Sequence, residues 1–145
     1  MEIVFAEKND LPALTVLALK LWPHHGREEM QAELAAIMAK DDGAFFLAQD
    51  GERFVGFAQC QLRHDYVEGT DSSPVGYLEG IYVEDTHRHQ GAAKDLLAAC
   101  EGWARAKGCG EFASNCELEN TESLCFHLKV GFTEANRIIC FVKKL

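Results

Sequence analysis

The chain has 145 residues, of which 48% are hydrophobic and 26% are charged, enough apolar material for one domain with its own core. Its formal net charge of −9 argues against nucleic acid or an anionic membrane as a partner and favours a cationic ligand. No apolar run approaches the roughly 20 residues that cross a bilayer, and the mixed charges near the first residue are unlike a signal peptide. We therefore expect a single domain over residues 1–145, located in the cytoplasm.

The first part of the chain is predicted to form a strand, two helices and a hairpin. Pro12 lies in the first turn of the first helix and Pro23 follows its last turn, while Asp50-Gly51 is a strong hairpin signal. In chain order the expected elements are a strand at 3–6, a helix that begins within 9–12 and stops at 22–23, a helix at 28–40, and strands at 44–49 and 54–63.

The second part continues with a loop and alternating strands and helices. We expect a loop at 65–74, a strand at 75–83, a turn at 86–93, a helix at 93–106, a strand at 111–114, a helix at 121–130, and strands at 132 and 138–142. This order predicts an α/β or α+β fold with a mixed sheet.

The cysteines and histidines predict no metal site. The cysteines form no C-x-x-C pair, and the histidines show no i, i+4 pairing on a helix. We expect the cysteines to be reduced core or surface residues, and neither Cys116 nor Cys125 to be a nucleophile.

A short motif, Arg88-x-x-Gly91-x-Ala93, stands directly before the amphipathic helix at 93–106. The first N–H groups of a helix lack intrahelical partners and carry positive partial charge, so they bind phosphate oxygens. Small residues leave room for such a ligand, and Arg88 and His89 add positive charge. The pattern is loose, and an ordinary glycine-containing turn is the alternative. It is neither a Walker A loop nor a Rossmann fingerprint.

Glu79 is the acidic residue that we favour for function. It lies inside the strand at 75–83 between apolar Leu78 and Ile81, where an unpaired carboxylate would be costly. In a cleft it would bind an ammonium group and, through water, accept its proton. Other candidates also have plain interpretations: a packed helix end for Trp22, a solvated histidine for His25, and a packed loop aromatic for Tyr66.

Several of these segments together resemble a known family. Strand 78–83, the turn at 88–93 and the later Asn120 with Gly131-Phe132 resemble the GNAT superfamily of acetyl-CoA-dependent N-acetyltransferases. Residues 63–83, with 21–23 and 111–114, are similar to the chromosomal type of aminoglycoside 6′-N-acetyltransferase. The resemblance implies a mixed, mostly antiparallel central sheet with a splayed strand pair and flanking helices. It also implies a homodimer, in which strands within 132–145 pair with the second subunit.

The resemblance also implies which residues bind the two substrates. Acetyl-CoA would be held by the backbone of one strand, by the turn before the helix and by an asparagine: Ile81, Tyr82, Val83, Arg88, His89, Gln90, Gly91, Ala92, Ala93, Lys94 and Asn120. The amine would be bound by Trp22, His25, Tyr66, Glu79, Asn115 and Asn136. The last two positions are acidic in the family's closest members. Asparagine removes charge but still accepts hydrogen bonds, so we expect lower affinity or an altered range.

The expected reaction is direct attack of a free amine on the thioester in a ternary complex. Glu79 is the candidate base, and His127 occupies the position where many superfamily members use a tyrosine to protonate the leaving thiolate, although it equally suits a helix cap. We expect acetylation of the 6′-amine of aminoglycosides, and hence resistance, with no metal. The alternatives are acetylation of a polyamine, amino sugar or protein amine, and a non-catalytic acyl-CoA-binding module.

Overall fold

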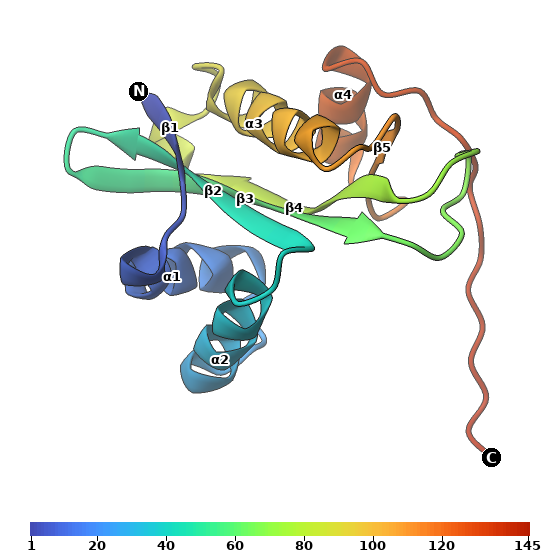
Figure 1. Ribbon diagram of the computed structural model, residues 1–145, viewed down its shortest axis with the longest axis horizontal. Coiled ribbons are helices and arrows are strands. Elements are labelled where there is room, and N and C mark those ends of the chain that lie inside the picture. The colour runs from blue at the N-terminus through green and yellow to red at the C-terminus, as the bar shows by residue number, and fades with distance from the viewer.

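A computed structural model, which describes residues 1–145, places a five-stranded sheet between two layers of helices (Figure 1). Helices α1 and α2 lie on one side of the sheet, and α3 and α4 lie on the other. The elements are β1 (Glu2–Phe5), η1 (Lys8–Asp10), α1 (Leu11–Leu21), α2 (Arg27–Met38), β2 (Gly43–Asp50), β3 (Arg53–Arg63), β4 (Val75–Val83), η2 (Asp85–His87), α3 (Ala92–Ala106), β5 (Phe112–Ala113) and α4 (Thr121–Lys129).

The sheet has the order β1-β2-β3-β4-β5, and only the β4–β5 pair is parallel. The predicted hairpin between β2 and β3 is present, and Gly51 in its turn has φ 63°, a conformation that glycine adopts without steric cost. The expected mixed, mostly antiparallel sheet with flanking helices is therefore confirmed.

Each face of the sheet has its own apolar cluster. Leu14 and Leu34 of α1 and α2 pack with Phe57 of β3 on one face. On the other face Leu96 of α3 packs with Leu78 of β4. The alternation of side chains along a strand divides the apolar residues between these clusters. No helix combines the length and the apolar composition that crossing a bilayer requires.

A β-bulge interrupts β4 at Glu79. Gln59 of β3 faces Gly80 and Cys60 faces Leu78, so Glu79 is an extra residue without a partner. Leu78 packs in the cluster under α3, and alternation then turns Glu79 to the α1 side. Gly80 faces that side as well, because a Cβ on it would lie 2.6 Å from the indole of Trp22 on the α1 side. Two successive residues on one face mark a bulge, which re-aims side chains near functional sites.

Strands β4 and β5 separate soon after they meet. They pair only at Gly76 with Phe112 and at Tyr77 with Ala113, after which β4 continues to Val83 with this edge open. The expected splayed strand pair is thus present, and β5 is shorter than the predicted strand at 111–114.

The predicted strands at 132 and 138–142 are wrong for the single chain. Residues 132–145 carry no strand: Phe132 packs against the body, Asn136 contacts the β3–β4 loop, and the chain beyond it runs away as an extended tail (Figure 1). Phe141 and Val142 are 90% and 95% exposed. The local sequence favours extension, but a strand also needs a neighbour for its backbone hydrogen bonds, and no other segment of this chain pairs with it.

Candidate active site

The turn before α3 presents a row of free backbone amides. His89 has φ 63° and Gly91, the N-cap residue, has φ 86°. No amide from 89 to 94 donates to a backbone carbonyl, whereas the next amide, that of Asp95, donates to the carbonyl of Gly91. A Cβ on Gly91 would meet nothing within 4 Å, so the space beside the turn is open. This arrangement fits the diphosphate of a nucleotide such as coenzyme A.

The side chain of Arg88 fixes this turn to the end of β4. Its Nε donates to the carbonyl of Val83 at 2.9 Å, and its guanidinium pairs with Asp85 at 2.9 Å. His89 and Lys94 are exposed beside the amides and can supply the positive charge. Arg88 therefore shapes the turn, a contribution that the motif alone does not reveal.

Asn120 has a local role at the start of α4. It is the N-cap residue, and its Oδ1 accepts a hydrogen bond from the amide of Ser123 at 3.0 Å. Its side-chain amide group carries no hydrogen bond within the chain and can donate to a ligand.

On the opposite side of the sheet, Glu79 is not the unpaired carboxylate that the sequence suggested. The guanidinium of Arg63 donates to both of its oxygens, at 3.0 and 2.8 Å. The same guanidinium stacks on the ring of Tyr77, 3.6 Å from its centroid, and the hydroxyl of Tyr77 accepts a hydrogen bond from Asn115. The hydrogen bond to Glu79 raises the pKa of Arg63 above its ordinary value, so this side chain stays cationic. Glu79 and Asn115 thus belong to one connected cluster.

Trp22 lies beside this cluster. Its indole contacts Gly80 and packs edge-on against Phe57, with ring centroids 5.9 Å apart. A half-buried aromatic ring next to a carboxylate is an arrangement that can bind a cation beside an apolar surface.

The other three predicted amine-binding residues lie outside this cluster. His25 is exposed and contacts Glu29 at 3.1 Å. Tyr66 is 77% exposed in the β3–β4 loop and has no hydrogen-bond partner. Asn136 donates to Glu68 of the same loop at 3.0 Å. The single chain therefore brings Trp22, Glu79 and Asn115 together but does not bring these three residues into contact with them.

His127 is held at both ring nitrogens. Nδ1 lies 2.7 Å from the carbonyl of Ser123, and Nε2 lies 2.8 Å from the hydroxyl of Ser114. The ring also packs between Phe126 and Phe132, with centroids 5.8 and 5.1 Å away. His127 also bonds a carbonyl of its own helix, α4, which is the kind of contact that the alternative interpretation as a helix cap expects.

Sequence reasoning overlooked Arg63, Gly80 and Ser114. A signal was available for Gly80, because glycine inside a strand often marks a close approach by another group. Arg63 could have been found from its place on the strand that pairs with β4. Ser114 lies in the segment 111–114 that resembles the family, but no feature of the sequence assigned this residue a role.

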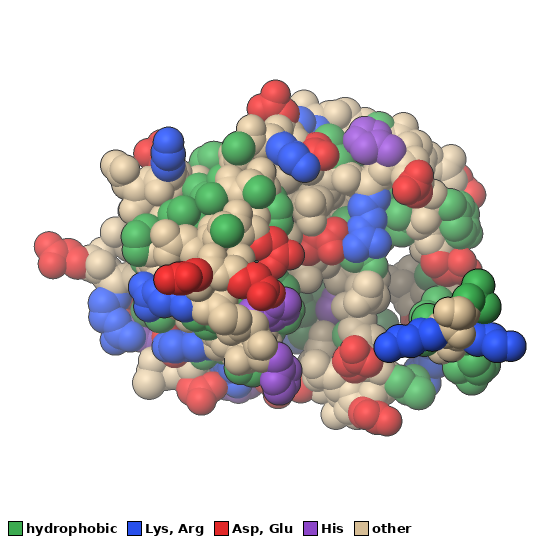
Figure 2. All heavy atoms as spheres, turned by 90° about the horizontal axis from the view of Figure 1, so that it is seen from below, with side chains coloured by type: hydrophobic (Ala, Val, Ile, Leu, Met, Phe, Trp, Pro, Cys, Tyr) green, Lys and Arg blue, Asp and Glu red, His purple; other side chains and the backbone are tan.

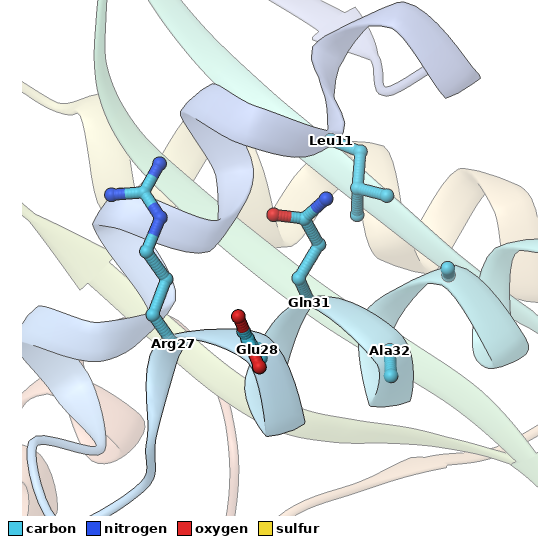
Figure 3. Close-up of a pocket in the computed structure, with 6 residues that line it drawn as sticks. Leu11, Arg27, Glu28, Gln31 and Ala32 are labelled. Carbon is cyan, nitrogen blue, oxygen red and sulfur yellow. The ribbon is translucent and has the colours of Figure 1, made fainter.

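Seen from the α1 and α2 side, the surface is hollowed beside the extended C-terminal tail, and acidic and basic side chains border the hollow (Figure 2). A separate pocket of about 540 Å³ is lined by Leu11 of α1 and by Arg27, Glu28, Gln31, Ala32 and Ala35 of α2 (Figure 3). It contains none of the predicted site residues and is not part of the site.

The cysteines are free thiols, as expected. Cys60, Cys100 and Cys109 are buried and the other three are exposed. The hydrogen bond to Cys60, together with burial, raises the pKa of the Cys100 thiol well above its ordinary value, which disfavours a nucleophilic thiolate.

The site thus combines the parts of an acyl-CoA-dependent transferase: the open edge of β4, the free amides before α3 and, across the sheet, the cluster that contains Glu79. The model of the acetyltransferase (GNAT) family matches residues 11–132, and the chain belongs to this family.

More particular similarities extend over the whole chain. It is 40% identical to an aminoglycoside N(6′)-acetyltransferase type 1 of Serratia marcescens, over 99% of each chain. It is 44% identical to the enzyme of the same name from Stenotrophomonas maltophilia, over 94% of this chain and 88% of the relative. A solved structure of AAC(6′)-Iy in complex with the bisubstrate analogue CoA-S-monomethyl-acetylneamine superimposes with a TM-score of 0.96 at 40% identity, covering 99% of this chain and 98% of the other.

Proposed function

We propose that this protein, as a single domain over 1–145, transfers the acetyl group of acetyl-CoA to the 6′-amine of aminoglycosides and so confers resistance to them. One observation carries the proposal. The gap between β4 and β5 has free amides of the α3 turn on one side and the Glu79 cluster on the other. Relatives of the same length bear the name of this activity, and a structural neighbour holds a molecule that joins CoA to an acetylated aminoglycoside.

On the donor side, recognition rests on the backbone. The amides of 89–94 would hold the pyrophosphate, with charge from His89 and Lys94. The open edge of β4 at Ile81, Tyr82 and Val83 would bind the pantetheine arm, and Asn120 would donate from α4. Acetyl-CoA supplies the activated acetyl group, and the fixed amides of β4 would stabilise the oxyanion that forms on its carbonyl.

On the acceptor side, Glu79 would receive the ammonium group of the aminoglycoside. An alkyl ammonium must lose a proton before it attacks, and Glu79 would accept that proton through water. Because the guanidinium of Arg63 already pairs with Glu79, the incoming ammonium group would share the carboxylate with this guanidinium. Trp22 would pack against the sugar ring, with Tyr66 and His25 closing the rim.

Asn115 and Asn136 would set the range of acceptors. Asn115 lies in the Tyr77 and Arg63 cluster, and Asn136 lies beside the β3–β4 loop. Both would accept hydrogen bonds from sugar hydroxyls and amines without adding negative charge. We therefore expect the enzyme to bind highly charged aminoglycosides less tightly than an enzyme with aspartates at these positions.

The test is thiol release from acetyl-CoA with three amines, namely a kanamycin-class aminoglycoside, spermidine and a lysine peptide. We expect release with the aminoglycoside and a product acetylated at the 6′-nitrogen, identified by mass spectrometry and NMR. Release only with spermidine or the peptide would show that the acceptor is a different amine. Release with none, together with retained coenzyme A binding, would indicate a non-catalytic acyl-CoA-binding module.

We also propose a homodimer, formed when the extended tail adds to a second copy. Ile138, Ile139, Phe141 and Val142 are 70–95% exposed, and the outer edge of β5 has no partner strand. Pairing would bury this apolar run and satisfy its backbone hydrogen bonds. We expect light scattering to give twice the mass of 16.1 kDa, and a chain shortened after Arg137 to give the monomer mass. A full-length chain that stays monomeric would contradict the dimer.

The cytoplasm is the proposed location. Three exposed free thiols, Cys116, Cys125 and Cys140, suit a reducing compartment. Fractionation of expressing cells should place the protein with cytoplasmic markers, and recovery with periplasmic markers would contradict this.

A further inference from the structure

Ser114 and His127 form a hydrogen-bonded pair beside the gap between β4 and β5. The hydroxyl of Ser114 lies 2.8 Å from Nε2 of His127. The carbonyl of Ser123 lies 2.7 Å from Nδ1, and because a carbonyl oxygen only accepts, this contact is a hydrogen bond that Nδ1–H donates. Nε2 is the ring nitrogen directed at Ser114, its hydrogen-bond partner.

The chain path places this pair on the α4 side of the gap. Phe112 packs with the cluster on the α3 side of the sheet, and Ala113 packs with Tyr77 on the opposite side. Ser114 then returns to the α4 side, where His127 holds it, one residue beyond the last β4–β5 pair. Glu79 faces α1 on the other side. An amine that arrives beside Glu79 and a sulfur that departs beside Ser114 would thus lie on opposite sides of the reacting carbonyl.

We propose that Ser114 is a catalytic residue that passes a proton from His127 to the departing thiolate. As the bond between the carbonyl carbon and sulfur breaks, sulfur takes the hydroxyl proton of Ser114, and Ser114 takes the proton on Nε2 of the His127 imidazolium. The ring ends neutral, with its hydrogen on Nδ1, and regains one proton from water. The two protons that the ammonium loses leave through Glu79 and water, so one proton is released per acetyl transferred.

The fixed geometry is what makes Ser114 suitable for this step. Phe126 and Phe132 pack against the imidazole, and the Ser123 carbonyl sets its rotation, so Nε2 stays directed at Ser114. Such pre-orientation avoids reorganisation during proton transfer. The inference rests on the acetyl transfer proposed above, but it names a residue and a direction of proton movement that the transfer itself does not require.

The experiment compares two variants of Ser114 with a control variant at a serine outside this pair. Ser114→Ala should lower kcat about 10²-fold, while Ser114→Thr, which keeps a hydroxyl, should stay within about 5-fold of the native rate. The matched control is Ser72→Ala in the β3–β4 loop, because it also removes a serine hydroxyl that is bonded to a side chain, that of Glu111, and does not touch His127. It should change kcat less than about 2-fold. Coenzyme A affinity, measured by calorimetry, should be the same in all three.

Two further measurements separate proton transfer from a structural role. The pH dependence of kcat should differ between the native enzyme and Ser114→Ala, because only the native enzyme passes a proton through this pair. In the unliganded protein, ¹⁵N NMR of His127 should show hydrogen on Nδ1 across the titration, with Ser114→Ala shifting Nε2 alone. A neutral ring that carries its hydrogen on Nε2 would overturn the proposal.

Other results would overturn it as well. Native turnover and pH dependence in Ser114→Ala would remove Ser114 from the mechanism while leaving the acetyl transfer intact. An acetyl group on Ser114, detected by mass spectrometry after mixing with acetyl-CoA, would replace the proton relay with an acyl-enzyme. A native protein that acetylates no amine would refute both the relay and the proposed function.

Discussion

The two sides of the gap between β4 and β5 are built by different means. On the donor side, the proposed recognition rests on backbone amides before α3 and on the open edge of β4. On the acceptor side, the proposed recognition rests on side chains from β3, β4, the end of α1 and the segment after β5, namely Arg63, Glu79, Trp22 and Asn115. A backbone site needs only the right turn and helix, whereas a side-chain site depends on each residue and on how its neighbours hold it.

Substitutions on the acceptor side should change amine kinetics and leave coenzyme A binding unaltered. The following predictions test this separation, in order of decreasing expected effect.

The largest effect is expected for Glu79→Gln. The amide cannot take the proton of the ammonium group, and it leaves Arg63 without its bidentate partner, so kcat with an aminoglycoside should fall about 10²-fold. Coenzyme A affinity, measured by calorimetry, should not change. The control is Glu84→Gln, which removes another paired carboxylate just beyond β4, and it should keep kcat within about 2-fold. Equal activity of Glu79→Gln and the native enzyme would exclude Glu79 as the base.

Gly80→Ala should have the next largest effect. The new Cβ would lie 2.6 Å from the Trp22 ring and would push the indole out of its place, so KM for the aminoglycoside should rise about 10-fold. Gly102→Ala is the matched control, because nothing lies within 4 Å of the added carbon on α3. Steady-state kinetics in which both variants behave alike would show that the position of Trp22 does not matter for binding.

Asn115→Asp should strengthen acceptor binding modestly. The added charge faces the ammonium groups of the substrate, and the hydroxyl of Tyr77 can donate to the new carboxylate. We expect KM for a polycationic aminoglycoside to fall about 3-fold at low salt, and less at high salt. Asn9→Asp adds the same charge near η1 and serves as the control. A KM that rises in Asn115→Asp would contradict the electrostatic explanation.

The smallest effect concerns stability and lies outside the site. The hydrogen bond from Lys20 holds the pKa of Glu84 below its ordinary value of 4.5, so the ionised form stabilises the folded state above that pH. Glu84→Gln should lower the free energy of unfolding by about 0.5 kcal/mol at pH 7. The difference should vanish as the pH falls through the lowered pKa. Urea unfolding at pH 7 and near pH 3 measures it, and a difference that persists in acid would refute this assignment.

Much of the donor side could be predicted from the sequence, because it depends on local pattern. The helix after Gly91 and the free amides before it follow from residues adjacent in the chain, as does the hairpin at Asp50-Gly51 elsewhere in the sheet. The acceptor side could be predicted only as candidate residues. The pairing of Glu79 with Arg63 joins positions sixteen apart, and it depends on a bulge that no local pattern announces.

The C-terminal tail, residues 138–145, also shows that the sequence predicts local conformation but not pairing with a distant segment. Its apolar residues correctly indicate an extended segment, but whether that segment becomes a strand depends on a partner surface that the chain does not offer itself.

The sequence by itself determined where the helices and most strands lie, because short-range periodicity and turn residues govern those features, and it marked the turn that we propose binds a nucleotide diphosphate. Only the tertiary structure decided that β4 bulges at Glu79, that Arg63 pairs with it, and that Ser114 meets His127. The physical reason is that strand register and helix packing bring distant side chains to within 3 Å of each other, and no local pattern in the sequence specifies those distances.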